Sequence, residues 1–198
     1  MRALALRFCL CLTLVTAPMA ASAGPATDLI RELADKAIQT LAETDDNLAA
    51  REQRLRPILA DGFDMPQIAK FTLGRYWNRA SEAQRHDYVA AFSQFVVATY
   101  ARRFGGYSGE TLEIISEREM GPKDVAVMTR IVRGANPPID AEWRVRVDDG
   151  PAKVIDVVVE GVSMSVTQRA DFSAVVRRNG IDGLIQVLQA RAGRLGAQ

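Results

Sequence analysis

The chain has 198 residues, with 25 basic and 24 acidic side chains, a single histidine, His86, and a formal net charge of +1. The charges are interspersed, which excludes the clustered basic excess of a nucleic-acid-binding domain and gives no support for constitutive adhesion to an anionic membrane. The only cysteines, Cys9 and Cys11, lie in the first 23 residues. The rest of the chain therefore has no disulfide framework and too few nitrogen and sulfur ligands for a zinc site.

The first 23 residues predict an export signal. Arg2 and Arg7 precede an apolar run at 8–17, and Ala21-Ser22-Ala23 provides small residues at the cleavage positions. About ten apolar residues are too few for a membrane anchor, which needs about twenty. Cleavage after these 23 residues leaves 24–198, which we expect to form a single domain of 175 residues outside the cytoplasm.

Four helices are predicted in the first half of this domain, at about 27–44, 46–55, 66–71 and 81–104. Thr27 is the expected N-cap of the first helix, whose apolar residues recur at three- and four-residue spacing. Pro57 is expected to end or restart the second, because proline has no amide hydrogen for the helix ladder. Gly74 closes the third helix. Ser81 and Gln84 form a capping box at the start of the fourth.

The fourth predicted helix has an unusually aromatic face. That face consists of Tyr88, Phe92, Phe95, Val96, Thr99 and Tyr100. The spacing predicts core packing or, alternatively, one wall of an apolar pocket.

From residue 110 the apolar period changes from 3.6 to 2, which predicts strands. Four are expected, at about 111–116, 124–133, 139–147 and 154–160, with turns at Asn136-Pro137-Pro138 and Asp148-Asp149-Gly150. In the third strand, Ile139, Ala141, Trp143, Val145 and Val147 alternate with charged residues, and Ile155, Val157 and Val159 share one side of the fourth.

Two further helices are expected at 167–178 and 182–191, separated by Asn179-Gly180. The whole pattern predicts an α+β fold, in which a curved four-stranded antiparallel meander is covered on its apolar face by helices.

Catalytic groups are scarce in this sequence. His86 lies about 200° round its helix from the apolar face, and we expect it to face water. The pairs Asp45-Asp46 and Asp148-Asp149 belong to turns and lack the glycine and glutamate of a calcium loop. Asp156 is the one acid–base candidate inside a strand, with a polar position on the outer face of the sheet as the alternative. No catalytic residue, metal or cofactor is predicted, so the sequence favours binding.

Two blocks of sequence resemble a known family. The first contains Phe63-Asp64, Phe71-Thr72-Leu73-Gly74-Arg75-Tyr76-Trp77 and Gln84-Arg85, and continues through Ala91-Phe92 to Thr99-Tyr100-Ala101. The second, from Val159 to Leu188, reads VEGVSMSVTQRADFSAVVRRNGIDGLIQVL. Together they resemble the toluene-tolerance (MlaC) family of periplasmic lipid-binding components of Mla (maintenance of lipid asymmetry) transport systems. A branch of the family associated with hopanoid lipids is also similar. Residues 105–123 match the family poorly.

The resemblance implies a cystatin/NTF2-like fold that encloses an apolar cavity for acyl chains. It also implies a phospholipid carrier, without a cofactor, that crosses the periplasm between an inner-membrane ABC transporter complex and an outer-membrane lipoprotein complex. A hopanoid or other polycyclic lipid is the alternative cargo. Alternatives of other classes are an NTF2-like periplasmic enzyme with a carboxylate base such as Asp156, and a structural adaptor with an exposed apolar patch.

The pocket of such a carrier is expected between the aromatic helix and the sheet. Its expected lining is Phe92, Phe95, Val96, Tyr100, Val127, Trp143, Val145, Val157, Val159 and Met164. Met164 is included because a flexible thioether adapts to mixed chains. Leu73, Gly74, Tyr76 and Trp77 are expected to join helices and not to contact the ligand.

Overall fold

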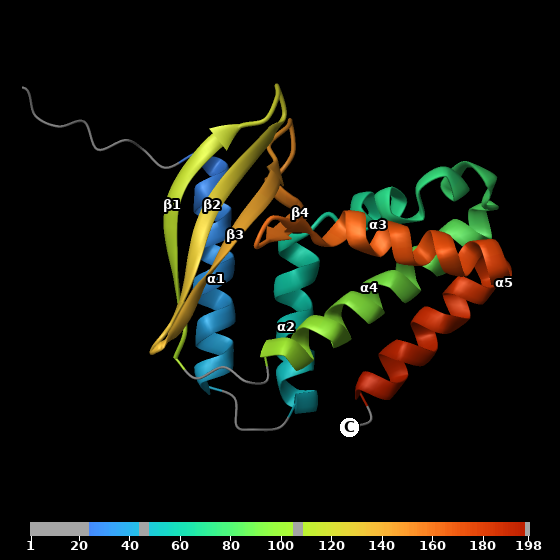
Figure 1. Ribbon diagram of the computed structural model, residues 1–198, viewed down its shortest axis with the longest axis horizontal. Coiled ribbons are helices and arrows are strands. Elements are labelled where there is room, and N and C mark those ends of the chain that lie inside the picture. Colours follow the sequence, from blue (N-terminus) through green and yellow to red (C-terminus); the bar gives the residue numbers. More distant parts are fainter. Residues whose placement is uncertain (1–23, 44–47, 105–108, 197–198) are drawn as a thin grey trace, which may run out of the picture.

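The computed structural model describes residues 24–43, 48–104 and 109–196 (Figure 1). The export signal predicted at 1–23 lies outside these ranges. In chain order the elements are α1 (Pro25–Glu43), α2 (Leu48–Gly62), α3 (Met65–Leu73), the 3-10 helix η1 (Gly74–Arg79), α4 (Glu82–Phe104), β1 (Thr111–Glu119), β2 (Asp124–Arg133), β3 (Asn136–Arg146), β4 (Lys153–Val159), β5 (Val162–Ser163) and α5 (Met164–Gly196). None of the helices in the described ranges is long and apolar enough to cross a bilayer.

The strands form one antiparallel sheet in the order β1-β2-β3-β4-β5, which confirms the meander. The predicted count of four strands is wrong by one, because β5 has only two residues and therefore no alternation to read. The turn predicted at Asn136-Pro137-Pro138 is also wrong, since the chain turns at Gly134–Ala135 and both prolines lie in β3. That part of β3 tolerates proline because β4 pairs with β3 only from Ala141 onward.

Strand register gathers the apolar alternation on one side of the sheet, here called the inner face. Trp143 pairs with Val127 of β2 and with Val157 of β4, and Ala141 pairs with Val159. Directly paired residues point to the same side of a sheet. The predicted apolar positions of β3 therefore share one apolar surface with their partners in β2 and β4.

A β-bulge changes the inner face at the start of β4. Val145 pairs with Val154, whereas Arg144 pairs with Asp156, so Ile155 is the extra residue between them. The expected position of Ile155 on the apolar side is wrong for this reason. Val154 takes its place and is completely buried.

Helix α1 lies along the inner face (Figure 1). Its residues Ala26 and Ile30 are 1% exposed and pack against buried valines of β2, β3 and β4. The prediction of Thr27 as N-cap is wrong, because the helix already begins at Pro25, a residue that suits the first turn. The Thr27 hydroxyl instead donates to Glu117 of β1 (2.6 Å), which fixes α1 against the edge of the sheet.

The other helices form a second layer beyond β4 with its own core (Figure 1). The ring of Phe172 in α5 lies 6.3–6.4 Å from the rings of Tyr88, Phe92 and Phe95 in α4, in edge-to-face arrangements. All four residues are buried. Core packing is therefore confirmed for these positions of the aromatic face.

The capping signals of the helical layer are confirmed. Ser81 and Gln84 exchange backbone-to-side-chain hydrogen bonds of 3.1 Å at the start of α4. Gly74 ends α3 with a positive φ of 58°, a conformation that other residues adopt with strain.

The helices α2 and α5 differ most from their predicted ranges. Pro57 lies inside α2, which continues to Gly62. The flanking residues Leu55 and Leu59 are buried, and this burial offsets the hydrogen bond that proline removes. The two final helices are one element, α5, and the predicted break is present within it as a kink at Gly180 (φ 72°).

The hydroxyl of Tyr88 provides a test of the helical core. It lies 2.8 Å from the Thr72 hydroxyl, and burial raises the pKa of Tyr88 above its ordinary value of 10.0. As the pH rises, the Tyr88 hydroxyl therefore loses its proton in the unfolded chain before it does so in the folded protein. The contribution of Tyr88 to stability is thus complete below pH 10 and falls at higher pH.

Tyr88→Phe is therefore expected to lower the free energy of unfolding at neutral pH by about 1 kcal/mol, the value of one hydrogen bond. The variant should also lose stability less steeply than the natural protein above pH 10. Urea denaturation at neutral and alkaline pH measures both effects. Equal alkaline slopes in the two proteins would contradict the prediction.

Candidate functional site

The inner face carries a tryptophan in a fixed orientation. Trp143 Nε1 donates to the Thr129 hydroxyl (2.9 Å), and that hydroxyl donates to the carbonyl of Ala141 (3.2 Å). Phe63 meets the indole edge-on, with 6.4 Å between the ring centroids. Trp143 is nevertheless only half-buried, so part of this large apolar side chain is left uncovered.

Phe63 joins the apolar cores of the two layers. It packs against the inner-face core and against the helical core. Beside it, the Asp64 amide donates to the carbonyl of Val154 (2.9 Å), and Lys153 Nζ donates to the carbonyl of Asp61. These contacts tie the end of α2 to β4. The apolar surface of the sheet therefore continues into the helical layer at Phe63, a role that sequence reasoning did not assign to it.

The structure distributes the predicted lining over both layers. The inner-face core contains Val127, Trp143, Val145 and Val157, and strand register places Val159 on the same face. The helical core contains Phe92, Phe95 and Val96. Two residues are half-buried in helices: Tyr100 in α4 and Met164 in α5. The strand residues thus lie together, and the residues of α4 lie together in the other layer, where α4 packs against α2, α3 and α5. Contact with a ligand stays a prediction for all ten residues.

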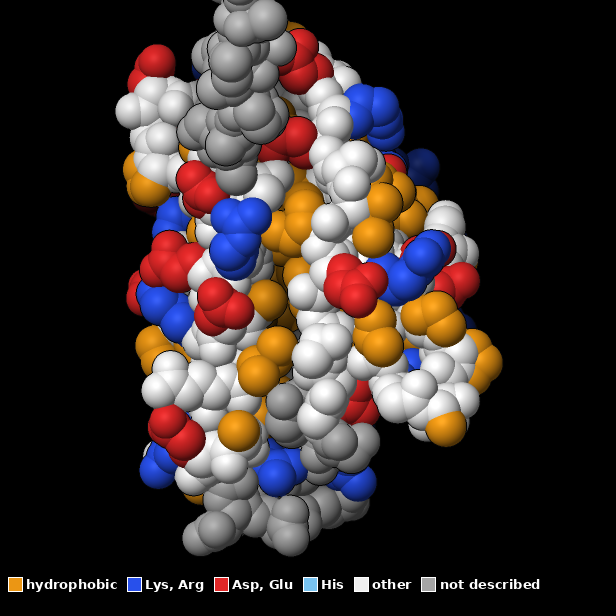
Figure 2. Space-filling model, turned by 90° about the vertical axis from the view of Figure 1, so that its left-hand side faces the viewer, with side chains coloured by type: hydrophobic (Ala, Val, Ile, Leu, Met, Phe, Trp, Pro, Cys, Tyr) orange, Lys and Arg blue, Asp and Glu red, His pale blue; other side chains and the backbone are white. Residues whose placement is uncertain are grey.

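An apolar furrow lies between α1 and the edge strand β1. Figure 2 shows hydrophobic side chains uncovered between these two elements, with charged side chains on either side. Leu33 of α1 and Leu112 and Ile114 of β1 are half-buried members of the inner-face core. Sequence reasoning missed these residues as part of a site. The apolar stripe of the first helix and the alternation at 111–116 could have pointed to these residues, but neither pattern shows that the two elements face each other.

An open pocket of about 390 Å³ lies near the C-terminal ends of α4 and α5. Its lining consists of Phe95, Arg102, Arg191, Arg194 and Leu195, so it includes one residue of the predicted set. Guanidinium groups at helix C-termini interact favourably with the negative ends of the helix dipoles. Arg194 lies in the last turn of α5, where this interaction applies.

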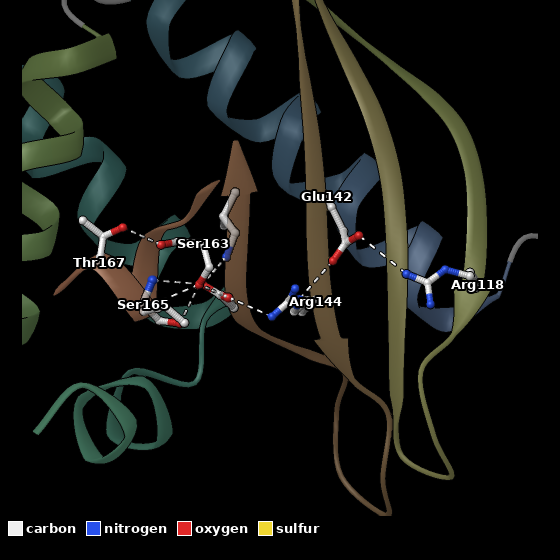
Figure 3. Close-up of polar contacts among 9 residues, drawn as sticks. Arg118, Glu142, Arg144, Ser163, Ser165 and Thr167 are labelled. Carbon is white, nitrogen blue, oxygen red and sulfur yellow. Dashed lines mark hydrogen bonds and ion pairs between the residues drawn. The ribbon is translucent and has the colours of Figure 1, made fainter. Parts of the chain in front are cut away.

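A chain of charged contacts crosses the opposite, outer face of the sheet (Figure 3). Arg118 of β1 lies 3.6 Å from Glu142 of β3, Glu142 lies 2.9 Å from Arg144, and Arg144 lies 3.3 Å from Asp156 of β4. These ion pairs connect three strands on the side that faces away from α1.

Asp156 ends this chain, and its carboxylate is fully hydrogen-bonded although the residue is only 8% exposed. Oδ1 accepts from the amides of Val157 (2.9 Å) and Ser165 (3.1 Å), and Oδ2 accepts from the Ser163 hydroxyl (2.6 Å) and from Arg144 (3.3 Å). Four donors fill the acceptor sites of a carboxylate. Asp156 therefore fixes the junction of β4, β5 and α5, and its position on the outer face argues against the enzyme alternative.

The described part of the chain has no cluster suited to a metal ion. No group of three or more His, Cys, Asp or Glu residues there is placed to hold a metal ion. His86 is exposed beside Asp87 (3.2 Å), which confirms the expectation that it faces water.

Asp156→Asn is expected to destabilise the junction. The amide offers one acceptor oxygen in place of two and removes one of the carboxylates that pair with Arg144, so we expect the free energy of unfolding to fall by about 2–4 kcal/mol. Ser163→Ala removes a single hydrogen bond and should cost about 1 kcal/mol. Urea denaturation compares the three proteins, and an unchanged midpoint for the Asp156 variant would refute the assigned role.

Known proteins share both the sequence pattern and the fold. The family model described as MlaC protein matches residues 31–190. The intermembrane phospholipid transport system binding protein MlaC of Haemophilus influenzae is 26% identical over 197 residues, which cover 96% of this chain and 92% of that protein. The structure of a phospholipid-binding protein from Ralstonia solanacearum in complex with a phospholipid has a TM-score of 0.78 at 23% identity, covering 87% of this chain and 99% of that one. The chain therefore belongs to the MlaC protein family.

Proposed function

We propose that this protein is a periplasmic carrier of phospholipid. The observation that carries the proposal is the incompletely covered apolar inner face, where Leu112, Ile114 and Trp143 remain half-buried beside fully buried valines. Membership of the family supports it, as do relatives whose names describe phospholipid binding and transport.

An uncovered apolar surface of this kind can shield acyl chains from water. At about 0.8 kcal/mol per methylene, two chains of roughly fifteen methylenes cost on the order of 20 kcal/mol to expose to water. A phospholipid therefore crosses an aqueous space only when a protein covers its chains. Covering them requires apolar surface and no nucleophile, metal or cofactor, while the head group can stay at the protein surface.

We place the acyl chains along the inner face. Trp143, Val157 and Val159 are half-buried there and are held on one side by strand register. Phe63 links this surface to the helical layer, in which Val96 is also half-buried. The half-buried members of the predicted lining in both layers would then contact one continuous ligand.

The carrier would work between two membranes. Residues 1–23 would supply the cleaved export signal, and 24–198 would form the single lipid-binding domain. Its partners would be an inner-membrane ABC transporter complex and an outer-membrane lipoprotein complex. The description of the Haemophilus influenzae relative as a binding protein of intermembrane phospholipid transport supports this arrangement.

Protein purified after expression of the full chain is expected to carry bound phospholipid, detected by native mass spectrometry and by extraction. Val157→Asp should lower the bound lipid strongly, because it places a carboxylate on the inner face among acyl chains. Ile115→Asp is the matched control, since Ile115 of β1 is 55% exposed.

A polycyclic lipid in place of phospholipid would favour the alternative cargo. Absence of any lipid from the natural protein, or equal lipid content in the two aspartate variants, would count against the carrier.

The two tryptophans, Trp77 and Trp143, allow the ligand to be located. Phospholipids with brominated acyl chains quench an indole only at close range. The Trp77→Phe variant retains Trp143 on the inner face, and its fluorescence should fall when such lipids are bound. The Trp143→Phe variant retains Trp77, which packs on the helical core beneath Arg85, and should keep its fluorescence. The reverse pattern would exclude the proposed position of the chains.

A further inference from the structure

The near-neutral balance of charge conceals a strong segregation between the two layers. The helical layer, residues 48–104 and 164–196, has 14 basic and 7 acidic side chains. Helix α1 and the sheet, residues 25–43 and 111–163, have 9 basic and 14 acidic side chains. The fold therefore separates a cationic layer from an anionic one, although the two alternate along the chain.

Part of the cationic excess forms what we call the arginine surface, made by Arg75 and Arg79 of η1 and Arg169 and Arg177 of α5. All four side chains are exposed. Arg75 donates to the Tyr76 hydroxyl (3.1 Å). This hydrogen bond lowers the pKa of Tyr76, and the charges of Arg75, Arg177 and Arg79 lower it further, as expected for cations gathered around one hydroxyl.

The arginine surface lacks internal neutralisation. Arg169 lies 5.2 Å above the ring of Phe71, and its Nε is close to Gly74, where a Cβ would lie 2.8 Å away. In the described part of the chain, none of the four guanidinium groups lies within ion-pair distance of a carboxylate. Their charge is therefore available to an external anion.

Apolar side chains accompany these cations at the surface. Phe71 is 39% exposed beneath Arg169, and Val166 is 52% exposed. With about 100° per residue, Val166, Arg169 and Arg177 fall within one sector of α5. Exposed apolar groups among cations without ion-pair partners are the combination that binds the interface of an anionic bilayer. There the guanidinium groups meet lipid phosphates, and the aliphatic part of each arginine side chain stays in the apolar zone.

We propose that the arginine surface docks this protein on anionic phospholipid bilayers, with Arg75, Arg79, Arg169 and Arg177 facing lipid phosphates and with Phe71 and Val166 at the interface. Docking does not depend on the carrier function, because it uses a surface of α3, η1 and α5 and not the inner face. Adsorption to vesicles therefore tests docking, the lipid content of the purified protein tests the carrier function, and either result can be negative without the other.

Vesicle flotation tests the proposal, with vesicles of phosphatidylcholine alone or with added phosphatidylglycerol. The natural protein should float with the anionic vesicles at low salt, and should be released at high salt because surface charges are then screened. Arg79→Gln combined with Arg177→Gln should weaken adsorption roughly 30-fold, about fivefold for each lost cation. Val166→Ser should weaken adsorption less, and by a factor that is the same at low and at moderate salt, because it removes apolar contact and no charge.

Arg31→Gln combined with Lys123→Gln is the matched control, since it removes two exposed cations from α1 and the β1–β2 turn and should adsorb like the natural protein. Melting curves establish that all variants remain folded. Equal adsorption to neutral and anionic vesicles, or an equal loss in the control, would overturn the proposal. No adsorption at low salt would also overturn it and would point instead to an acidic protein as the occupant of this surface.

Discussion

The junction between β4 and α5 sets how the two layers of the molecule are joined. Asp156 accepts four hydrogen bonds there, from the neighbouring amide of Val157, from Ser163 of β5, from Ser165 in the first turn of α5, and from Arg144 of β3. A buried carboxylate is tolerated only when its acceptor sites are filled, so the direction in which α5 leaves the sheet is constrained by this one side chain. Because Phe172 and the rest of the helical core belong to α5, the position of the second layer follows from the same contact.

A second attachment, from Phe63 to β4, restrains the helical layer at the same end of the sheet. With both attachments at β4, the helices cover only part of the inner face, and α1 alone lies along the rest (Figure 1). One helix is narrower than a sheet of several strands. Half-buried apolar side chains such as Leu112 and Trp143 result from this incomplete cover. The same geometry that joins the layers thus leaves the surface on which the proposed ligand would lie.

Segregation of charge is a further consequence of the fold. The acidic excess of α1 and the sheet and the basic excess of the helical layer come from segments that alternate along the chain, so composition alone suggested a neutral protein without affinity for anionic surfaces. Only the packing of η1 against α5 gathers Arg75 and Arg177 around Tyr76.

Local patterns in the sequence determined most elements of this protein. The capping box of Ser81 and Gln84, the exact span of 124–133 as a strand and the break at Gly180 all depend on neighbours within a few residues, and all are present in the structure. Positions set by distant partners were decided by the tertiary structure. Burial of Leu55 and Leu59 keeps α2 intact through Pro57, and the bulge at Ile155 selects Val154 for the inner face. Periodicity identifies the apolar side of each element, but which apolar sides meet, and where they stay uncovered, depends on contacts between residues far apart in the chain.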